Sequence, residues 1–252
     1  MSTRIEKLRN SKYETIIFRN LAKITGRRLV HFLHIGKTGG TSIKYALRWN
    51  FFTKNYIISL HRHSTTLEDI PEGEYVFFFV RDPIGRFVSG FYSRLREGKP
   101  RHYKPHTPEE KKAFSKFKTP NELAEALSSS DSEIKKAAMD AMKAIGHVKT
   151  SYWDWFKDED YFTSRVNDIV FVGRQEYLSQ DFEKLKKILG LPPSLTLPQS
   201  DVLAHKTPDY YDKRLSELAV KNLRKWYKKD YEFLKLCEEL GLLPEGSYDF
   251  KD

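Results

Sequence analysis

The chain has 252 residues and carries 44 lysines and arginines against 34 aspartates and glutamates, so its formal net charge is +10. This length suits one α/β domain with a full core or at most two small domains, and no window is long and apolar enough to span a bilayer. The positive charge favours an anionic partner such as a nucleic acid, a membrane surface or a phosphorylated or sulfated small molecule, without selecting among them.

The N-terminus and the cysteine content lead to an expectation about the compartment. Residues 1–20 contain neither an apolar signal core nor a small-residue cleavage site. Cys237 is the single cysteine, which excludes an internal disulfide and is typical of a reducing compartment. Because Cys237 lies in the apolar pattern of a late helix, we expect a buried core thiol in a cytoplasmic protein.

Short apolar runs and amphipathic runs alternate in the first part of the chain. Residues 1–27 are polar and are expected to form an N-terminal helix or a loosely held arm. Buried strands are predicted in the 28–36 region, over 54–61 and over 74–82. A helix is predicted over 41–52 from the helical spacing of Ile43, Ala46, Leu47 and Phe51. Strands that alternate with helices favour a parallel sheet with crossover helices.

A second amphipathic helix is predicted directly after the third strand, over 83–98. Asp82 is placed to cap this helix, and Pro83 suits its first turn. Residues 97–165 are polar, charged and predicted to be helical, with a capping-box pattern at Thr119 and Glu122. Aromatic residues near position 155 suit either a sugar ring or helix packing, and their spacing favours packing: Tyr152, Trp153, Trp155 and Phe156.

The last third of the chain is predicted to add one strand and further helices. A fourth strand is expected over 168–174, followed by a helix over 177–190 with Gly190 as its C-cap. A proline-rich connection, 191–208, then precedes a long helical region, 209–240.

The loop between the first strand and the first amphipathic helix has the composition of an anion cradle. Backbone N–H groups at a helix N-terminus attract an oxyanion, and glycine allows the backbone to approach it. Lys37 adds a positive charge, and the remaining members of the cradle add amides or hydroxyls: Thr38, Gly39, Gly40, Thr41 and Ser42. The alternative is an ordinary glycine-rich turn.

The letters GKT at 36–38 invite comparison with the loop of nucleoside-triphosphate-binding proteins. That motif requires G-x-x-x-x-G-K-[ST], with a glycine five residues before the second glycine. His31 occupies the position five residues before Gly36, and the adjacent glycines follow Lys37. The triphosphate motif therefore fails on spacing.

Two stretches resemble motifs of sulfotransferases that use 3′-phosphoadenosine 5′-phosphosulfate (PAPS). "HIGKTGGTS" is similar to the family's 5′-phosphosulfate loop, with Gly36 where proline is usual, and "RDPIGRFVS" resembles its 3′-phosphate motif. Physically, Arg81 leaves the carboxyl end of a buried strand, and Ser89 lies about two turns into the next helix, so both can grip a phosphate. The alternatives are a salt bridge for Arg81 and an ordinary exposed position for Ser89.

A weaker similarity covers residues 168–240. "DIVFVGRQEYLSQDFEKLKKILGL" is similar to the family's late strand and helix. "AHKTPDYYDKRL" lies where such enzymes often close a loop over the nucleotide, which makes Lys206 and Thr207 candidate PAPS contacts or members of a solvated loop.

The pair of histidines in "SLHRHSTT" supplies a candidate base for sulfuryl transfer. A histidine has a pKa near operating pH, and His61 and His63 follow the second strand at the edge that carries the cradle. The pair resembles that of heparan sulfate and uronyl 2-O-sulfotransferases, which implies His61 as base and His63 as a substrate or transition-state contact. A two-histidine metal site is the alternative, but spacing reveals no third ligand, so we expect no metal.

The resemblance implies an α/β fold, with a three-layer, P-loop-like parallel sheet flanked by helices in a single domain, 1–252. Residues 97–165 would form a helical insertion for the acceptor. The implied reaction moves the sulfuryl group of PAPS by in-line displacement to a hydroxyl of a carbohydrate, such as an anionic glycan, or of another small metabolite. Lys37 would neutralise charge on the departing adenosine 3′,5′-bisphosphate.

Two other function classes remain as alternatives. A P-loop kinase or NTPase would bind ATP with Mg²⁺. A basic nucleic-acid-binding module would need a continuous basic face or a recognised reader motif, and the sequence contains neither, so no nucleic-acid partner is expected.

Overall fold

The computed structural model describes residues 12–100, 102–200 and 207–250, and the chain divides into two compact units. The sheet unit contains the residues up to Val80, Tyr152–Gln199 and Cys237–Ser247. The helical unit contains Arg81–Ser151, Ser200–Leu236 and the residues from Tyr248 onward. The fold is α/β, as predicted, with the strands in one unit and most helices of residues 97–165 in the other.

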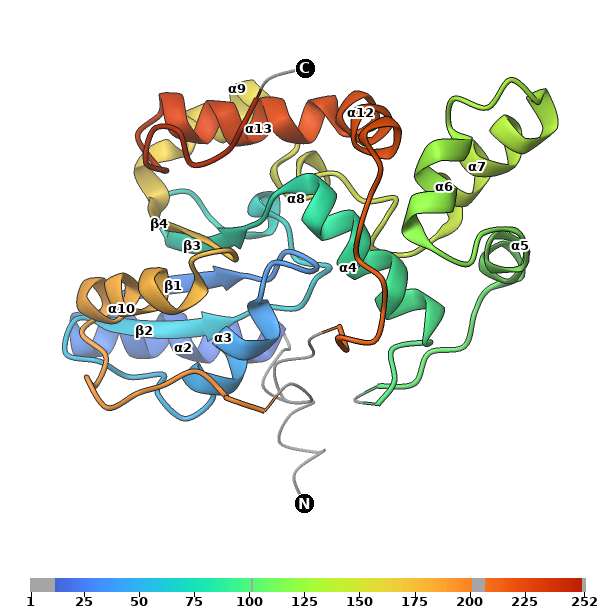
Figure 1. Ribbon diagram of the computed structural model, residues 1–252. Coiled ribbons are helices and arrows are strands. Elements are labelled where there is room, and N and C mark those ends of the chain that lie inside the picture. Colours follow the sequence, from blue (N-terminus) through green and yellow to red (C-terminus); the bar gives the residue numbers. More distant parts are fainter. Residues whose placement is uncertain (1–11, 101, 201–206, 251–252) are drawn as a thin grey trace. The chain divides into compact units, whose positions relative to one another are not determined.

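The sheet unit is built on four parallel strands in the order β2-β1-β3-β4 (Figure 1). Their bounds are β1 Arg28–Leu33, β2 Tyr56–Leu60, β3 Tyr75–Val80 and β4 Ile169–Arg174. All four lie inside the ranges predicted from apolar runs, and their parallel pairing confirms the prediction from alternating strands and helices. Parallel strands place all their carboxyl ends at one edge, so the segments after β1 and β2 begin there.

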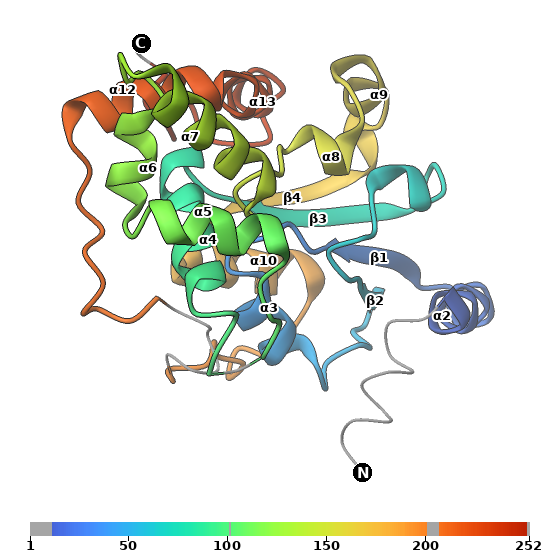
Figure 2. The same cartoon turned by 90° about the vertical axis from the view of Figure 1, so that its right-hand side faces the viewer.

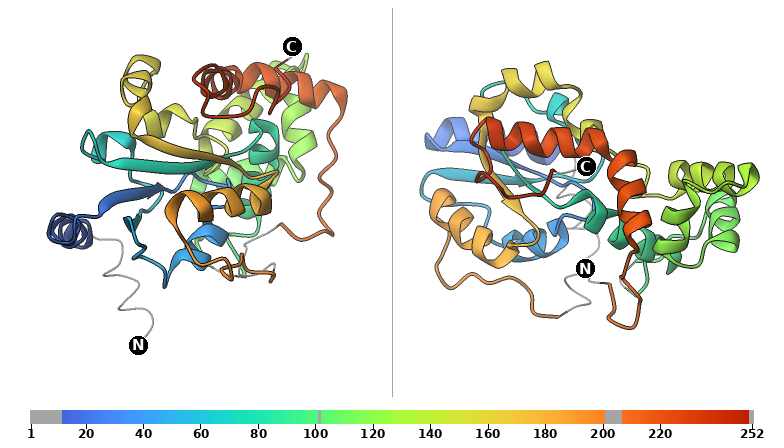
Figure 3. Two further views of the ribbon diagram at one scale, coloured as in Figure 1. Left: turned by 90° about the vertical axis from the view of Figure 1, so that its left-hand side faces the viewer. Right: turned by 45° about the horizontal axis from the view of Figure 1, so that its top comes forward.

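The two faces of the sheet are covered by different helices. On one face, side chains of the sheet pack against α3 (Gly40–Leu47) and α10 (Leu178–Leu189): Val30, Phe32, Ile58, Leu60, Phe77 and Phe79. On the other face lie α2 (Lys12–Thr25), α8 (Trp153–Phe156) and α9 (Glu159–Ser164) (Figures 2 and 3). The α2 face includes His31, because side chains alternate along a strand.

The predicted packing role of the aromatic cluster is confirmed in the sheet unit. Tyr152, Trp155 and Phe156 are buried, and the Phe156 ring lies 4.6 Å from the ring of Phe78 on β3. Cys237 is also fully buried, as expected for a core thiol. Two short 3-10 turns complete the unit, at Leu67–Asp69 (η1) and Val166–Asp168 (η2).

The ends of several helices differ from the prediction, and the helix predicted over 83–98 ends at Leu95. The helix predicted over 41–52 ends at Leu47, because the amide of Asn50 turns back to the Leu47 carbonyl at 2.9 Å and Phe51 pairs with Ile58. The helical region predicted from residue 209 begins only at Glu217, where the side chain of Ser216 caps the helix. Gly190 ends α10 in a left-handed conformation, as predicted.

The helical unit packs several short helices around an apolar core. Its helices are α4 Pro83–Leu95, α5 Pro108–Lys116, α6 Pro120–Ala126, α7 Ser132–Ala144 and α12 Glu217–Trp226, while α13 Lys228–Glu239 begins in this unit. The core gathers buried side chains from α4, α6, α7 and α12, including Phe87, Phe91, Leu123, Met142 and Leu223. The capping box of Thr119 and Glu122 is present at the start of α6, as predicted.

A buried ion pair joins α4 to α5 in the helical unit. Arg94 and Glu110 lie 2.6 Å apart and are almost completely buried. Burial opposes ionisation of Glu110, but hydrogen bonds from Arg94 and from the amides of Gly146 and Thr107 lower its pKa to about 2. Because the folded pKa lies below the unfolded value, this stabilisation is complete above about pH 4.5 and is lost as the pH falls toward 2.

Replacing Glu110 with glutamine is expected to destabilise the protein by about 3 kcal/mol, because it leaves the buried Arg94 guanidinium without a counter-charge. Urea unfolding at pH 7 measures this loss. Glu109→Gln, on the exposed neighbouring position of α5, is the matched control and should change stability by about 0.5 kcal/mol or less. Equal stability of the two variants would show that the buried pair contributes little.

Candidate active site

The loop after β1 has the backbone geometry of an anion cradle. Lys37 and Gly39 both adopt positive φ, 68° and 85°, and Gly39 is the N-cap of α3. The carbonyl of Gly39 accepts hydrogen bonds from the amides of Ser42 and Ile43. The preceding amides, those of Gly40 and Thr41, have no acceptor within the described part of the chain. Two N–H groups at the positive end of α3 are thus available to an anion.

His34 lies directly against this cradle. A Cβ atom added at Gly40 would lie 2.1 Å from Cδ2 of His34, so only glycine leaves room for the imidazole at this position. The His34 ring contacts the ring of His63 with centroids 3.8 Å apart. Nδ1 of His63 donates a hydrogen bond of 2.8 Å to the His34 carbonyl oxygen, and Trp155 donates one of 2.9 Å to the carbonyl of His63.

The hydroxyl groups of the loop differ in their surroundings. Thr38 is buried, and its hydroxyl donates to the carbonyl of Ile35 at 3.0 Å, which stabilises the turn itself. Thr41 is half-buried, and Ser42 is buried on α3. Thr41 is therefore the most accessible of the three predicted hydroxyl donors.

His61, the predicted base, belongs to a chain of four polar side chains. Its Nε2 lies 2.8 Å from Nδ1 of His31, and Nε2 of His31 lies 2.9 Å from a carboxylate oxygen of Glu74. Arg19 on α2 donates to both oxygens of the Glu74 carboxylate. The two imidazoles are nearly parallel, with centroids 5.0 Å apart. This arrangement connects α2, β1, the end of β2 and the segment before β3.

The surroundings of His61 keep its imidazole neutral. Burial lowers the pKa of His61 to about 3, with further lowering from the neighbouring His31 and Lys44, while Asp69 and Glu74 oppose the shift. Lys44 on α3 also donates a hydrogen bond of 3.1 Å to the backbone carbonyl of His61. At neutral pH His61 therefore has a lone pair available to accept a proton.

The second predicted motif begins the helical unit. Asp82 caps α4 by accepting a hydrogen bond of 2.9 Å from the Gly85 amide, as predicted, and its other oxygen accepts one of 3.0 Å from the Tyr231 hydroxyl. A Cβ at Gly85 would lie 3.1 Å from Nε of Arg81, so the guanidinium extends over the first turn of α4. Ser89 is half-buried and four residues beyond Gly85, which places it on the same face of the helix as Arg81.

Arg86, the second arginine of this motif, is buried and makes contacts within the helical unit. It is 2% exposed, pairs with Asp230 at 3.3 Å and donates to the hydroxyl of Thr150 at 2.7 Å. These contacts hold α4 against the other helices of the unit.

The structure describes only one of the two candidate nucleotide contacts late in the chain. Lys206 lies outside the described residues. Thr207 is half-buried, and its buried hydroxyl oxygen has no hydrogen-bond partner within the described part of the chain.

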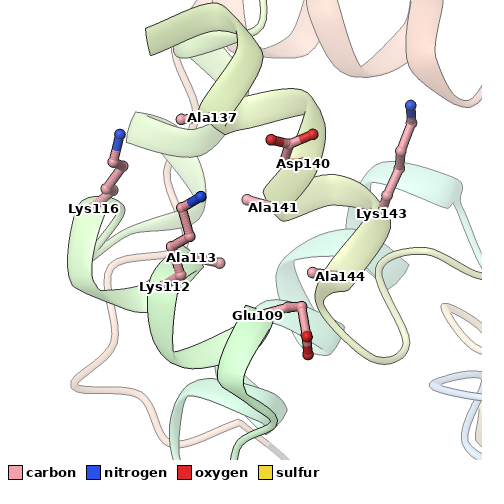
Figure 4. A pocket seen from close by; sticks show the side chains of 9 residues that line it. All are labelled: Glu109, Lys112, Ala113, Lys116, Ala137, Asp140, Ala141, Lys143 and Ala144. Carbon is pink, nitrogen blue, oxygen red and sulfur yellow. The ribbon is translucent and has the colours of Figure 1, made fainter. Parts of the chain in front are cut away.

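The helical unit also contains a cavity of about 350 Å³ between α5 and α7. It is lined by Glu109, Lys112, Ala113, Lys116, Ala137, Asp140, Ala141, Lys143 and Ala144. Figure 4 shows charged side chains around an alanine-rich floor. None of the predicted site residues lines this cavity, and its mixed charges indicate no particular chemistry.

Residues 12–100, 102–200 and 207–250 contain no group of three or more histidine, cysteine, aspartate or glutamate side chains arranged to hold a metal ion. No helix in these ranges is long and apolar enough to cross a membrane.

Reasoning from sequence missed four residues near the site: Arg19, His31, His34 and Glu74. His31 and His34 lie in an apolar strand region of the sequence, where strand alternation is the signal that places His31 on the opposite face from Phe32. Arg19 and Glu74 gave no signal, because they are far from the loop in sequence and meet only when α2 packs on the sheet.

Comparison with known proteins identifies one family. A family model described as "Sulfotransferase family" matches residues 21–236, which include the loop at 36–42, both predicted histidines and the motif at 81–89. No match was found among the curated proteins.

Proposed function

The chain belongs to the sulfotransferase family, and we propose that it transfers the sulfuryl group of PAPS to a hydroxyl of a carbohydrate or other small metabolite. The observation that carries this proposal is the end of the sheet where a neutral, half-buried His61 follows β2 and an anion cradle follows β1. Neighbouring parallel strands bring both segments to one edge.

The cradle fits the donor in several respects. PAPS supplies an activated sulfuryl group on a 5′-phosphate and also has a 3′-phosphate. We assign the 5′ end to Lys37, to the amides that follow Gly39 and to the loop hydroxyls, with Thr38 acting mainly within the turn. We assign the 3′-phosphate to Arg81 and Ser89, supported by their common face on α4. Lys206 and Thr207 are proposed as further nucleotide contacts, and the buried hydroxyl of Thr207 supports its assignment.

His61 is proposed as the general base. Its neutral imidazole takes the proton of the acceptor hydroxyl as the new oxygen–sulfur bond forms. Lys37 and the N-terminus of α3 stabilise the negative charge that develops on the leaving phosphate. His63 is proposed to contact the acceptor or the transferring group, because it is exposed and its Nδ1 is already donated to the His34 carbonyl. No metal is proposed, since these groups supply the positive charge.

The acceptor and the compartment are further parts of the proposal. The resemblance of His61 and His63 to the pair of 2-O-sulfotransferases supports a carbohydrate hydroxyl, including one on an anionic glycan. Residues 97–165 are proposed to contribute to acceptor binding, supported by their basic residues. We propose a cytoplasmic location on the basis of the single cysteine and the polar N-terminal segment.

Substitution of Arg81 tests the nucleotide assignment. Arg81→Gln is expected to weaken binding of adenosine 3′,5′-bisphosphate by about 10- to 100-fold, because a charge-assisted hydrogen bond contributes roughly 1.5–3 kcal/mol. Adenosine 5′-phosphosulfate lacks the 3′-phosphate, so its affinity should stay within about twofold of wild type. Isothermal titration of both nucleotides measures the difference.

A control arginine distinguishes a local effect from a loss of net charge. Arg28 is exposed at the amino end of β1, away from the edge where the cradle begins, and Arg28→Gln should leave both affinities unchanged. Equal weakening of both nucleotides by Arg81→Gln would remove Arg81 from the 3′-phosphate site.

A further inference from the structure

His31 occupies a position that the mechanism above does not use. It is fully buried on β1, and each of its two ring nitrogens has a polar partner: His61 at 2.8 Å and Glu74 at 2.9 Å. A buried imidazole with both nitrogens bonded has a defined orientation and a defined set of protons. His31 therefore links the predicted base to a carboxylate on the α2 face of the sheet.

The protons along this chain follow from the charge of Glu74. Burial opposes ionisation of Glu74, yet hydrogen bonds from Arg19 and His31 lower its pKa to about 2, so it is a carboxylate and accepts the Nε2 proton of His31. In neutral His31, Nδ1 then carries the lone pair and accepts from Nε2–H of His61. Neutral His61 is left with its lone pair on Nδ1, which has no partner within the described residues.

As a base, His61 must accept a proton, but its surroundings disfavour a charged imidazole. The chain of hydrogen bonds to Glu74 resolves this conflict. The titratable and charged groups that face His61 are His31 on β1, Lys44 on α3, Asp69 on η1 and Glu74 before β3, and burial disfavours an imidazolium there. A base that cannot hold positive charge gains from passing a proton onward. Glu74, which Arg19 holds in place, provides the negative charge beside the next imidazole.

We propose that Glu74 and His31 form a proton relay behind His61, with Nδ1 of His61 as the atom that receives the acceptor proton. This proposal rests on the proposed sulfuryl transfer. As the acceptor oxygen forms its bond to sulfur and the bond from sulfur to the leaving phosphate oxygen breaks, the hydroxyl proton moves to Nδ1 of His61. The Nε2 proton of His61 moves to Nδ1 of His31, and the resulting imidazolium pairs with the Glu74 carboxylate. His31 and Glu74 are positioning residues, since neither touches the acceptor.

Substitution of Glu74 tests the relay by its effect on the pH profile. Glu74→Gln keeps the size of the side chain but removes the charge that favours a protonated histidine pair. Transfer of labelled sulfate from PAPS to uronic-acid-containing oligosaccharides is expected to fall about 10- to 100-fold in kcat, with the KM for PAPS unchanged. The acid limb of kcat/KM should move to lower pH by about one unit or more, because a carboxylate near the pair raises its proton affinity.

Glu68→Gln is the matched control, because Glu68 is exposed on η1 and forms an ion pair with the surface residue Lys157. Glu68→Gln should change neither kcat nor the acid limb of the pH profile of kcat/KM. A Glu74→Gln enzyme with wild-type kcat, or with a lower kcat and an unmoved acid limb, would overturn the relay and leave Glu74 a structural role.

Nitrogen NMR of the wild-type protein tests the same proposal without a measurement of sulfate transfer, because it shows which ring nitrogens carry protons. With ¹⁵N-labelled histidine at pH 7, His61 and His31 should each be protonated on Nε2 and carry no proton on Nδ1. Assignment uses His61→Ala and His31→Asn. A proton on Nδ1 of His61 together with a doubly protonated His31 would overturn the relay. Absence of sulfate transfer by wild type, with the expected tautomers present, would count against the proposed function instead.

Discussion

His61→Ala is expected to lose sulfuryl transfer by about 10²- to 10⁴-fold while it still binds adenosine 3′,5′-bisphosphate with wild-type affinity. The physical reason is that His61 offers a neutral ring nitrogen to the acceptor, whereas the cradle is formed by Lys37 and the first turn of α3. The backbone carbonyl of His61 that accepts from Lys44 remains in the variant. Initial rates with labelled PAPS and titration with the bisphosphate measure the two properties separately.

The control for this variant is an exposed residue at the opposite end of β2. Lys54 is exposed just before the amino end of β2, and Lys54→Ala should transfer sulfate at the wild-type rate. Turnover of His61→Ala within about threefold of that rate would remove His61 from the mechanism, and loss of bisphosphate binding would give it a role in the cradle.

Gly40→Ala is expected to weaken binding of adenosine 3′,5′-bisphosphate by about 100-fold or more, because a displacement of the loop by about 1 Å is enough to misplace its donors. The added methyl would lie 2.1 Å from Cδ2 of His34. The ring cannot retreat freely, since His63 packs against it with centroids 3.8 Å apart. The loop amides of Gly40 and Thr41 would therefore shift from their positions at the start of α3.

A double variant shows whether the collision causes the loss. His34→Ala removes the ring that meets the new methyl, so His34→Ala/Gly40→Ala should bind the bisphosphate more tightly than Gly40→Ala alone. Circular dichroism melting checks that each variant is folded. If the double variant binds no better than Gly40→Ala, the effect comes from the backbone of α3 rather than from the contact with His34.

Local patterns predicted most of the fold. The strands were found because apolar runs of strand length alternate with helical stripes, and the caps at Asp82, Thr119 and Gly190 were found because each uses a local backbone interaction. The end of α3 was missed because it depends on the pairing of Phe51 with Ile58, which brings two segments together only after folding. A helical stripe alone carries no information about such a pairing.

The candidate site likewise has one part that local sequence patterns predict and another part that depends on the folded structure. The cradle at 36–42 and the motif at 81–89 are contiguous in sequence, so residue type and spacing were enough to find them. The chain Arg19–Glu74–His31–His61 connects four separate segments, and its hydrogen bonds depend on the packing of α2 and on the alternation of side chains along β1. The constraint of His34 on Gly40 also needed coordinates, because it depends on the direction of a ring beyond the end of a strand.

The most direct test of the central claim is a thermal shift of the wild-type protein with adenosine 3′,5′-bisphosphate in the presence of EDTA. A ligand at 100 times its Kd stabilises the folded state by about 2.7 kcal/mol, which for a chain of this length raises Tm by roughly 5–10 °C. We predict such a rise without metal, and a clearly smaller one with ATP and Mg²⁺. No rise at millimolar bisphosphate, with a rise for ATP and Mg²⁺, would contradict PAPS-dependent transfer and favour a nucleoside-triphosphate enzyme.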